Sequence, residues 1–250
     1  MPETMPETML ILAVYGMEVV EAGGALAANV ADGGTSHAAV LLARPAMQDD
    51  LPGAADQLGL SSLEFLDLES GAVEPSQAAK RQLVSLLRRI RPTIVITQDP
   101  EHVTSDLDPD RRPAMTLLLE SLALASRDFA ADDGLEPLAI PTIYYLTPVH
   151  ANCVVDVTPH WAAKQAAMDA LSSQLAFSAA HFERQLPPDH LEVLVPGYHE
   201  LAPGADRGRA LHRAIDHATH VAAGVGHHGS YAVAERYRRE GEFHLPRLLA

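Results

Sequence analysis

A polar segment over residues 98–113, QDPEHVTSDLDPDRRP, gathers the side chains best suited to chemistry. Its carboxylates Asp108 and Asp110 stand beside Arg111 and Arg112. Closely spaced carboxylates exchange protons with a substrate, and a guanidinium clamps an anionic group. Asp-Pro pairs also form ordinary solvated turns, which is the alternative interpretation. The segment predicts an acid/base site in which Asp108, Asp110 and Arg111 are the catalytic residues.

A second polar group falls near the end of the chain. His212, Asp216 and His220 follow one another at four-residue intervals, which places them on one face of a predicted helix. Adjacent pairs of such residues can share a metal ion, but 13 histidines produce many accidental spacings, so a polar helix face is the simpler interpretation. The glycine pattern over residues 224–229 follows a predicted helix rather than a strand, which favours a helix terminator over a dinucleotide site.

Alternating strands and helices must position these residues. Apolar strands are predicted at residues 9–14, 37–44, 62–68 and 93–97, and β-rich segments at 142–147 and 153–158. Helices are predicted at 23–34, around 54–59, from Ser76 to Pro92, from Pro113 and from near His160. This alternation predicts an α/β fold with a Rossmann-like, doubly wound, mostly parallel sheet. Ligands bind such sheets beyond the carboxyl ends of the strands, where the loops after residues 14 and 97 lie.

The helix that begins after Ser76 has the clearest pattern. Its serine is a typical N-cap, and its apolar residues recur with a helical period. The residues expected to face the core are Ala79, Leu83, Leu86, Leu87 and Ile90, and those expected to face solvent are Lys80, Arg81, Arg88 and Arg89. In the helix from Pro113 the inward residues are Met115, Leu118, Leu119 and Leu122.

Composition bounds the remaining possibilities. Hydrophobic residues form 47% of the 250, enough for one core, so we predict a single domain over residues 9–250. The polar, proline-containing repeat MPETMPET offers nothing to bury, so residues 1–8 are predicted to be a disordered extension. A formal net charge of −15 argues against nucleic acid and membrane surfaces as partners. The lone Cys153 excludes an intramolecular disulfide, and no apolar span or leader is present. These features predict a cytoplasmic protein.

Several segments then resemble one family in shared order and spacing. Residues 11–28, ILAVYGMEVVEAGGALAA, stand where the LmbE-like (PIG-L, GlcNAc-PI) de-N-acetylases have a strand, A-H-P-D-D-x-E, two glycines and a helix. RPTIVITQDPE and DPDRR are similar to the family's second strand and H-P-D-H-R segment. VDVTPHWAAKQAAMDALSSQ and AERYR resemble its V-D-I-T, Lys, Ser-Gln and A-E-A-F-R patterns. The resemblance implies a Rossmann-like fold built for zinc-dependent removal of acetyl groups.

The same alignment implies that the zinc site is lost, so no cofactor is expected. The family's zinc ligands are the first His, the second Asp and the last His, and here those positions hold Val14, Met17 and Arg111. Gly16 replaces the first Asp, and none of these side chains restores the chemistry. The predicted pocket includes residues of the first loop and of the second: Val14, Gly16, Met17, Glu18 and Glu21, with Asp99, Glu101 and His102. A gapped alignment would gather Glu18 or Glu21 with Asp99, Glu101, Asp108 and Asp110 into a carboxylate cluster.

Two functions remain open at this point. The first is a divergent or catalytically inactive relative that acts on or binds a small molecule in a biosynthetic pathway. The second is an active hydrolase of an acylated amine whose site is rebuilt or relocated. Without a metal, that hydrolase needs several kcal/mol of transition-state stabilisation from Arg111 and backbone donors. Family members often form oligomers, so the resemblance also allows a homo-oligomer.

Overall fold

The computed structural model describes residues 6–129 and 134–241 of the chain. Its central sheet has the strand order β3-β2-β1-β4-β5-β7-β6 over these residues. The strands are β1 (Thr8–Ala13), β2 (Thr35–Val40), β3 (Ser62–Phe65), β4 (Ile94–Gln98), β5 (Thr142–Leu146), β6 (Cys153–Asp156) and β7 (Ala234–Arg239). Strands β1 to β5 run parallel, whereas β7 pairs antiparallel with both β5 and β6. The predicted doubly wound, mostly parallel sheet is therefore confirmed.

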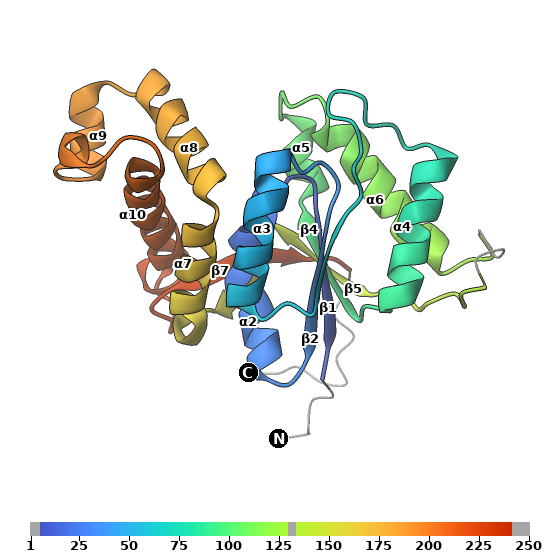
Figure 1. Cartoon of the computed structure of the whole chain (residues 1–250). Coiled ribbons are helices and arrows are strands. Elements are labelled where there is room, and N and C mark those ends of the chain that lie inside the picture. Colours follow the sequence, from blue (N-terminus) through green and yellow to red (C-terminus); the bar gives the residue numbers. More distant parts are fainter. Residues whose placement is uncertain (1–5, 130–133, 242–250) are drawn as a thin grey trace.

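Helices cover both faces of the sheet, and a helical lobe extends beyond one side of it (Figure 1). On one face lie α4 (Gln77–Ile90) and α6 (Arg111–Ala125), with the short α5 (Pro100–Thr104) near the carboxyl end of β4. On the other lie α1 (Met17–Glu21), α2 (Gly23–Ala31), α3 (Pro45–Leu58) and α7 (Trp161–Ala170). The lobe contains α8 (Ser172–Gln185), α9 (Pro188–Leu194) and α10 (Ala205–Ala223).

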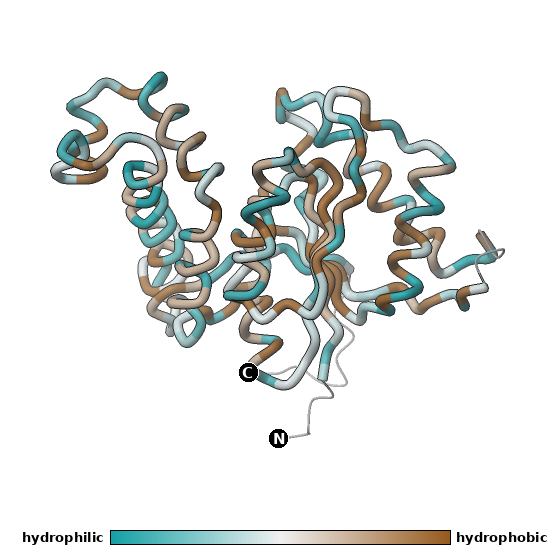
Figure 2. Tube along the Cα trace, in the orientation of Figure 1, coloured by the Kyte–Doolittle hydropathy of each residue, from teal (hydrophilic) through white to brown (hydrophobic). Residues whose placement is uncertain are grey.

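Side-chain alternation along β1 divides the core into two layers. Leu10, Leu12 and Val14 pack with α4 and α6, whereas Ile11 and Ala13 pack with α2, α3 and α7. A strand buried on both faces in this way reads as a continuous apolar run, as residues 9–14 do. Figure 2 shows the same arrangement, with hydrophobic strands at the centre and polar residues on the outer turns of the helices. Leu191, Tyr198 and Leu211 form a separate small core in the lobe.

Helix α4 follows the sequence pattern closely, with one exception. The Ser76 hydroxyl accepts a hydrogen bond from the Ala79 backbone N–H, and the predicted apolar face packs into the core. The prediction that Arg88 faces solvent is wrong. Its buried side chain donates to the backbone oxygens of Ala125 and Arg127, which supply acceptors that helical periodicity cannot reveal.

Several elements differ in extent from the sequence predictions, and the helices α3 and α2 differ most clearly. The helix expected around residues 54–59 begins at Pro45, because proline tolerates the first helical turn, where no N–H partner is needed. It ends at Gly59, whose φ of 70° is left-handed and suits glycine. The helix expected over residues 23–34 ends at Ala31, and the short α1 precedes it.

Strands β1 and β4 are the neighbours at which the order of connections reverses. Their pairing sets Leu12 opposite Thr97, so the loops that follow both strands lie side by side at one edge of the sheet. This edge is where a ligand site is expected in a doubly wound fold. The tertiary structure thereby brings residues 15–21 next to residues 99–111.

The described residues at the two ends of the chain can be compared with the predicted domain limits. Residues 1–5 of the expected extension and residues 242–250 lie outside the described residues, and Thr8 already belongs to β1. Within the described ranges, no helix is long and apolar enough to cross a bilayer.

Candidate functional site at the carboxyl edge of the sheet

Two groups of polar side chains lie at this edge. The first, called here the arginine network, surrounds Arg111 and consists of Tyr15, Glu18, Gln98, Asp106, Asp108, Asp110 and Arg111. The second lines a cavity of about 640 Å³ between the sheet and helices α1, α7, α8 and α10. Met17 and Glu21 are the two predicted site residues that line this cavity.

Arg111 holds the arginine network together. Its Nη1 donates to Gln98 Oε1 at 2.6 Å and lies 3.7 Å from Glu18 Oε1, while its Nε lies 3.4 Å from Asp106 Oδ2. The guanidinium carbon also lies 5.3 Å from the centre of the Tyr15 ring. Arg111 begins α6, so one side chain links that helix to the loops after β1 and β4.

The two predicted catalytic carboxylates serve the loop around them. Asp108 Oδ1 accepts from the backbone N–H groups of Asp110 and Arg111, and the Tyr15 hydroxyl donates to both Asp108 oxygens at 3.0 Å. Asp110 is buried and accepts from the Ser70 hydroxyl and the Gly71 N–H. Carboxylates with this many donors organise a turn and have little remaining capacity for a substrate.

Burial sets the protonation of the network. Glu18 accepts from the Tyr15 N–H and is almost wholly enclosed, which raises its pKa to about 8; the nearby Glu21 adds to this rise and Arg111 opposes it. Burial also raises the pKa of Tyr15, and its hydrogen bond to Asp108 adds to the effect. Both groups therefore favour their neutral forms around pH 7.

The resemblance implies zinc at this end of β1, but the side chains present do not fit it. Zinc requires imidazole, thiolate or carboxylate donors. Val14 is fully buried against α4 and α6, so it packs in the core instead of lining the predicted pocket. A Cβ at Gly16 would lie 2.4 Å from Leu51 Cδ1, so a larger residue does not fit there without rearrangement. Arg111 places a fixed cation at the position of the last histidine.

The remaining residues of the second loop do not join the predicted carboxylate cluster. Asp99 is buried and pairs with Arg238 at 2.7 Å, while also accepting from the Glu101 and Val149 N–H groups. Burial alone would raise its pKa, but these hydrogen bonds outweigh it and lower the pKa. Glu101 and His102 are exposed on α5. The structure thus separates three predicted members of the cluster: Asp99 pairs with Arg238, Asp110 accepts from Ser70 and Gly71, and Glu21 lines the cavity.

A buried ion pair between Lys164 and Glu235 lies at the base of the cavity, and the sequence did not predict this pairing. Lys164 Nζ donates to Glu235 Oε1 at 2.7 Å and to the backbone oxygens of Val20 and Glu21. Glu235 also accepts from the N–H groups of Gly24 and Ala25 and from the Tyr237 hydroxyl. Burial opposes ionisation of Glu235, yet Lys164 and these donors lower its pKa. Gly24, Lys164 and Glu235 lie in the G-G, Lys and A-E segments that resemble the LmbE-like family. That resemblance is the feature of the sequence that could have identified them.

The predicted face of α10 turns toward the same cavity. His212, Asp216 and His220 all line it. His212 Nε2 is hydrogen-bonded to the Ser178 hydroxyl at 2.9 Å, and His220 Nδ1 to the Asp216 backbone oxygen at 2.6 Å. Over residues 6–129 and 134–241, no three His, Cys, Asp or Glu side chains are placed to hold one metal ion.

His220 has the protonation state that a general base needs. Because a carbonyl oxygen can only accept, its Nδ1 carries the proton and its Nε2 keeps a lone pair. Burial lowers its pKa, and nearby Lys164 adds to this effect. The ring packs against Trp161, with 4.8 Å between the ring centres. His220 therefore stays neutral around pH 7.

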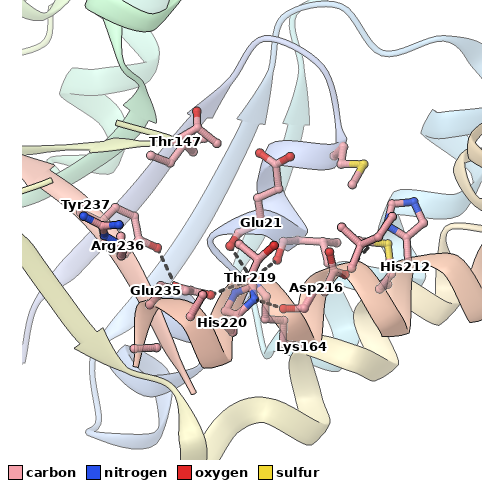
Figure 3. Close-up of a pocket in the computed structure, with 18 of the residues that line it drawn as sticks. Glu21, Thr147, Lys164, His212, Asp216, Thr219, His220, Glu235, Arg236 and Tyr237 are labelled. Carbon is pink, nitrogen blue, oxygen red and sulfur yellow. Dashed lines mark hydrogen bonds and ion pairs between the residues drawn. The ribbon is translucent and has the colours of Figure 1, made fainter. Parts of the chain in front are cut away.

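Thr147 closes the opposite side of the cavity, directly after β5 (Figure 3). Its φ is 47°, in the left-handed region that a β-branched residue rarely occupies. Such a backbone conformation costs on the order of 1–3 kcal/mol and tends to occur at functional sites. The unusual backbone conformation of Thr147 thus lies at the cavity and not in the arginine network.

Comparison with known proteins gives one sequence relative. No family model matches the chain. The diacetylchitobiose deacetylase of Thermococcus kodakarensis is 26% identical over 153 residues, which are 60% of this chain and 53% of that protein. The match therefore spans about half the length of the relative.

Solved structures share the fold over almost the whole chain. The conserved protein TT1542 from Thermus thermophilus superposes with a TM-score of 0.69 at 19% identity, covering 98% of this chain and 100% of that one. An N,N'-diacetylchitobiose deacetylase from Pyrococcus horikoshii gives 0.67 at 16% identity, covering 93% and 83%. At these identities the likeness concerns the fold.

Proposed function

We propose, from the relationship of this chain to the LmbE-like deacetylases, that it is a divergent relative that binds a small molecule in the cavity without their zinc chemistry. One observation carries the proposal. Arg111 stands at a position where the family has a zinc ligand, and its guanidinium is hydrogen-bonded to Gln98 and lies 3.7 Å from Glu18. The guanidinium of Arg111 would supply a positive charge in place of the zinc ion, but it would not supply zinc's catalytic chemistry.

The cavity supports the binding half of the proposal. Its volume of about 640 Å³ lies within the range of small-molecule sites, which is roughly 300–1,000 Å³. Met17 lines it at a family metal position, and Glu21 lines it one helical turn later. A small molecule at this edge would occupy the region where doubly wound folds bind their ligands.

Metal content and acetate release test the absence of zinc chemistry. We expect substoichiometric zinc in protein purified without chelator, and no acetate release from N-acetylglucosamine or diacetylchitobiose. Binding is tested by shifts in melting temperature across a panel of metabolites. Stoichiometric zinc together with chelator-sensitive acetate release would contradict the proposal.

His220 favours a second candidate, an amide hydrolase with a relocated site. A neutral imidazole with a free Nε2 can take a proton from water as the water attacks an amide carbonyl. The carbonyl oxygen would then need N–H donors in place of a metal. Acetate release that resists chelator and is lost in His220→Phe, with the fold intact by circular dichroism, would favour this candidate over binding alone.

A further inference from the structure

The charged groups that line the cavity differ in whether they have partners. Lys164 and Glu235 neutralise each other, and three acceptors surround Lys164 Nζ, whose ammonium has three N–H groups. Neither group is therefore available to a ligand without breaking a buried ion pair. The charges that remain on the lining belong to Glu21, Asp216 and Arg236.

Glu21 is the clearest unpaired group. Within the described parts of the chain, its carboxylate has no hydrogen bond and no ion pair, although its backbone oxygen accepts from Lys164. The carboxylate projects into the space opposite Thr147 (Figure 3). Burial raises its pKa, and the nearby charges of Lys164 and Arg111 oppose that rise without cancelling it, so the charged form is only partly compensated in this position. A positively charged ligand would supply that compensation.

Asp216 adds a second carboxylate with spare capacity. Its Oδ2 lies 3.9 Å from His212 Nδ1, which exceeds hydrogen-bonding distance. About a quarter of its side chain is exposed. His220, one turn along the same helix, presents a lone pair rather than an N–H group on Nε2. All three groups accept hydrogen bonds, so they match a donor with several N–H groups.

Arg236 does not cancel these carboxylates. Alternation along β7 sends its side chain to the face opposite Glu235 and Tyr237, and it is exposed. The rest of the lining includes apolar side chains of Val20, Leu146, Met168, Phe182 and Ile215. The cavity thus joins an apolar wall to one acceptor-rich, negatively charged wall.

We propose that the cavity recognises a small organic amine, whose ammonium group is held by the carboxylates of Glu21 and Asp216 while its body packs on the apolar wall. This inference rests on the proposed small-molecule function and specifies the charge of the ligand. An ammonium has three N–H donors, and two charge-assisted hydrogen bonds to carboxylates suit it well. A carboxylate or phosphate ligand would instead be repelled by the same wall.

Matched probes separate the charge of the ligand from its shape. Benzylamine, benzyl alcohol and benzoate, and the corresponding cyclohexylmethyl set, are titrated into the whole chain and followed by melting temperature and calorimetry. We expect the amines to bind more tightly than the alcohols, and the carboxylates not to bind. Glu21→Gln and Asp216→Asn are each expected to weaken amine binding by about tenfold. Asp189→Asn, an exposed carboxylate on α9, is the matched control and is expected to bind like the wild type.

The outcomes distinguish this inference from the proposed function. If alcohols bind as tightly as amines, or if Glu21→Gln leaves amine affinity unchanged, the ligand is not recognised by its charge, and only this inference fails. If the carboxylates bind best, the charge assignment is reversed and the inference fails in the same way. If no member of either set binds, this inference fails, and the metabolite panel decides separately whether the cavity binds a small molecule. Circular dichroism of each variant shows that lost binding does not reflect lost folding.

Discussion

The arginine network and the cavity lie at the same edge of one sheet, and both contain acidic side chains. They differ in whether those side chains have partners within the chain. In the network, Arg111 lies among Glu18, Gln98 and Asp106, and Asp108 and Asp110 accept from the loop that carries them. In the cavity, Glu21 has no such partner within the residues that the structure describes. Charges that are paired within the chain support its structure, and those that are not remain available to a ligand.

The segments that resemble the LmbE-like family contain some residues that the family also has and others that differ from it. Gly24, Lys164 and Glu235 come from retained segments and meet in one buried ion pair. A Cβ at Gly24 would lie 2.4 Å from Val157 Cγ1 and 2.7 Å from Glu235 Oε1, so glycine is needed for this contact. The replaced positions, Val14 and Arg111 among them, stand where the resemblance places metal ligands of the family. The retained residues therefore support the fold, whereas the replaced ones underlie the proposal that this chain lacks zinc chemistry.

The largest expected effect comes from Lys164→Met, which leaves Glu235 buried without its cation. We expect the free energy of unfolding to fall by about 3–5 kcal/mol, since an uncompensated buried charge is costly. Urea denaturation at pH 7 measures the change. The matched control is Lys80→Met, which removes a more exposed ion pair with Glu120 and should cost about 0–1 kcal/mol. Equal losses in the two variants would show that the pair with Glu235 has no special structural role.

A smaller effect is expected from Arg111→Met in the arginine network. Glu18 has a pKa of about 8 and can become neutral, so the loss should be about 1–3 kcal/mol, as for a broken hydrogen bond to a charged group. Adding Glu18→Gln should recover part of this loss, because it removes the ionised fraction of Glu18 that Arg111 no longer compensates. Arg112→Met, at an exposed neighbour, serves as the control and should change stability by about 0.5 kcal/mol or less. A double variant no more stable than Arg111→Met would argue against coupling between the two side chains.

The pH dependence of stability gives a third, smaller test through His220. In the unfolded chain this histidine takes up a proton below about pH 6.5, whereas burial makes the folded state resist it. The unfolded state then binds more protons, so stability should fall as the pH drops below about 6.5. His220→Phe keeps a ring against Trp161 and should reduce the difference in unfolding free energy between pH 7.5 and 5.5. His217→Phe, an exposed histidine on the same helix, should keep the wild-type difference.

The smallest expected effect is that of Glu21→Gln on stability. This carboxylate has no partner to lose, so the free energy of unfolding should change by about 0.5 kcal/mol or less, or rise slightly at pH 7. Glu235→Gln makes the same substitution in the same cavity but disturbs a full set of partners, and it should cost clearly more. Denaturation of the two variants side by side measures this difference. A large loss in Glu21→Gln would mean that the carboxylate is structurally paired.

Much of the fold follows from patterns that are local in the sequence. The apolar run at residues 9–14 and the helical period after Ser76 are enough to predict β1 and α4, because each pattern reflects burial along a single element. The errors occur where a partner comes from elsewhere. Arg88 is buried because α6 ends beside it. The segment Ala234–Arg239, for which no strand is predicted, forms β7 because the chain returns to the sheet after the helical lobe.

The sequence alone determined which residue types stand at the carboxyl edge, including the absence of imidazole at position 14 and the guanidinium at position 111. Those facts limit the chemistry whatever the fold, because a side chain cannot supply donor atoms that it lacks. Only the tertiary structure decided which charges are paired. Lys164 and Glu235 are 71 positions apart, Gln98 and Arg111 come from different elements, and Glu21 faces open space instead of a cation. Periodicity sets the direction of a side chain within its own element, but the charge it meets depends on how distant elements pack.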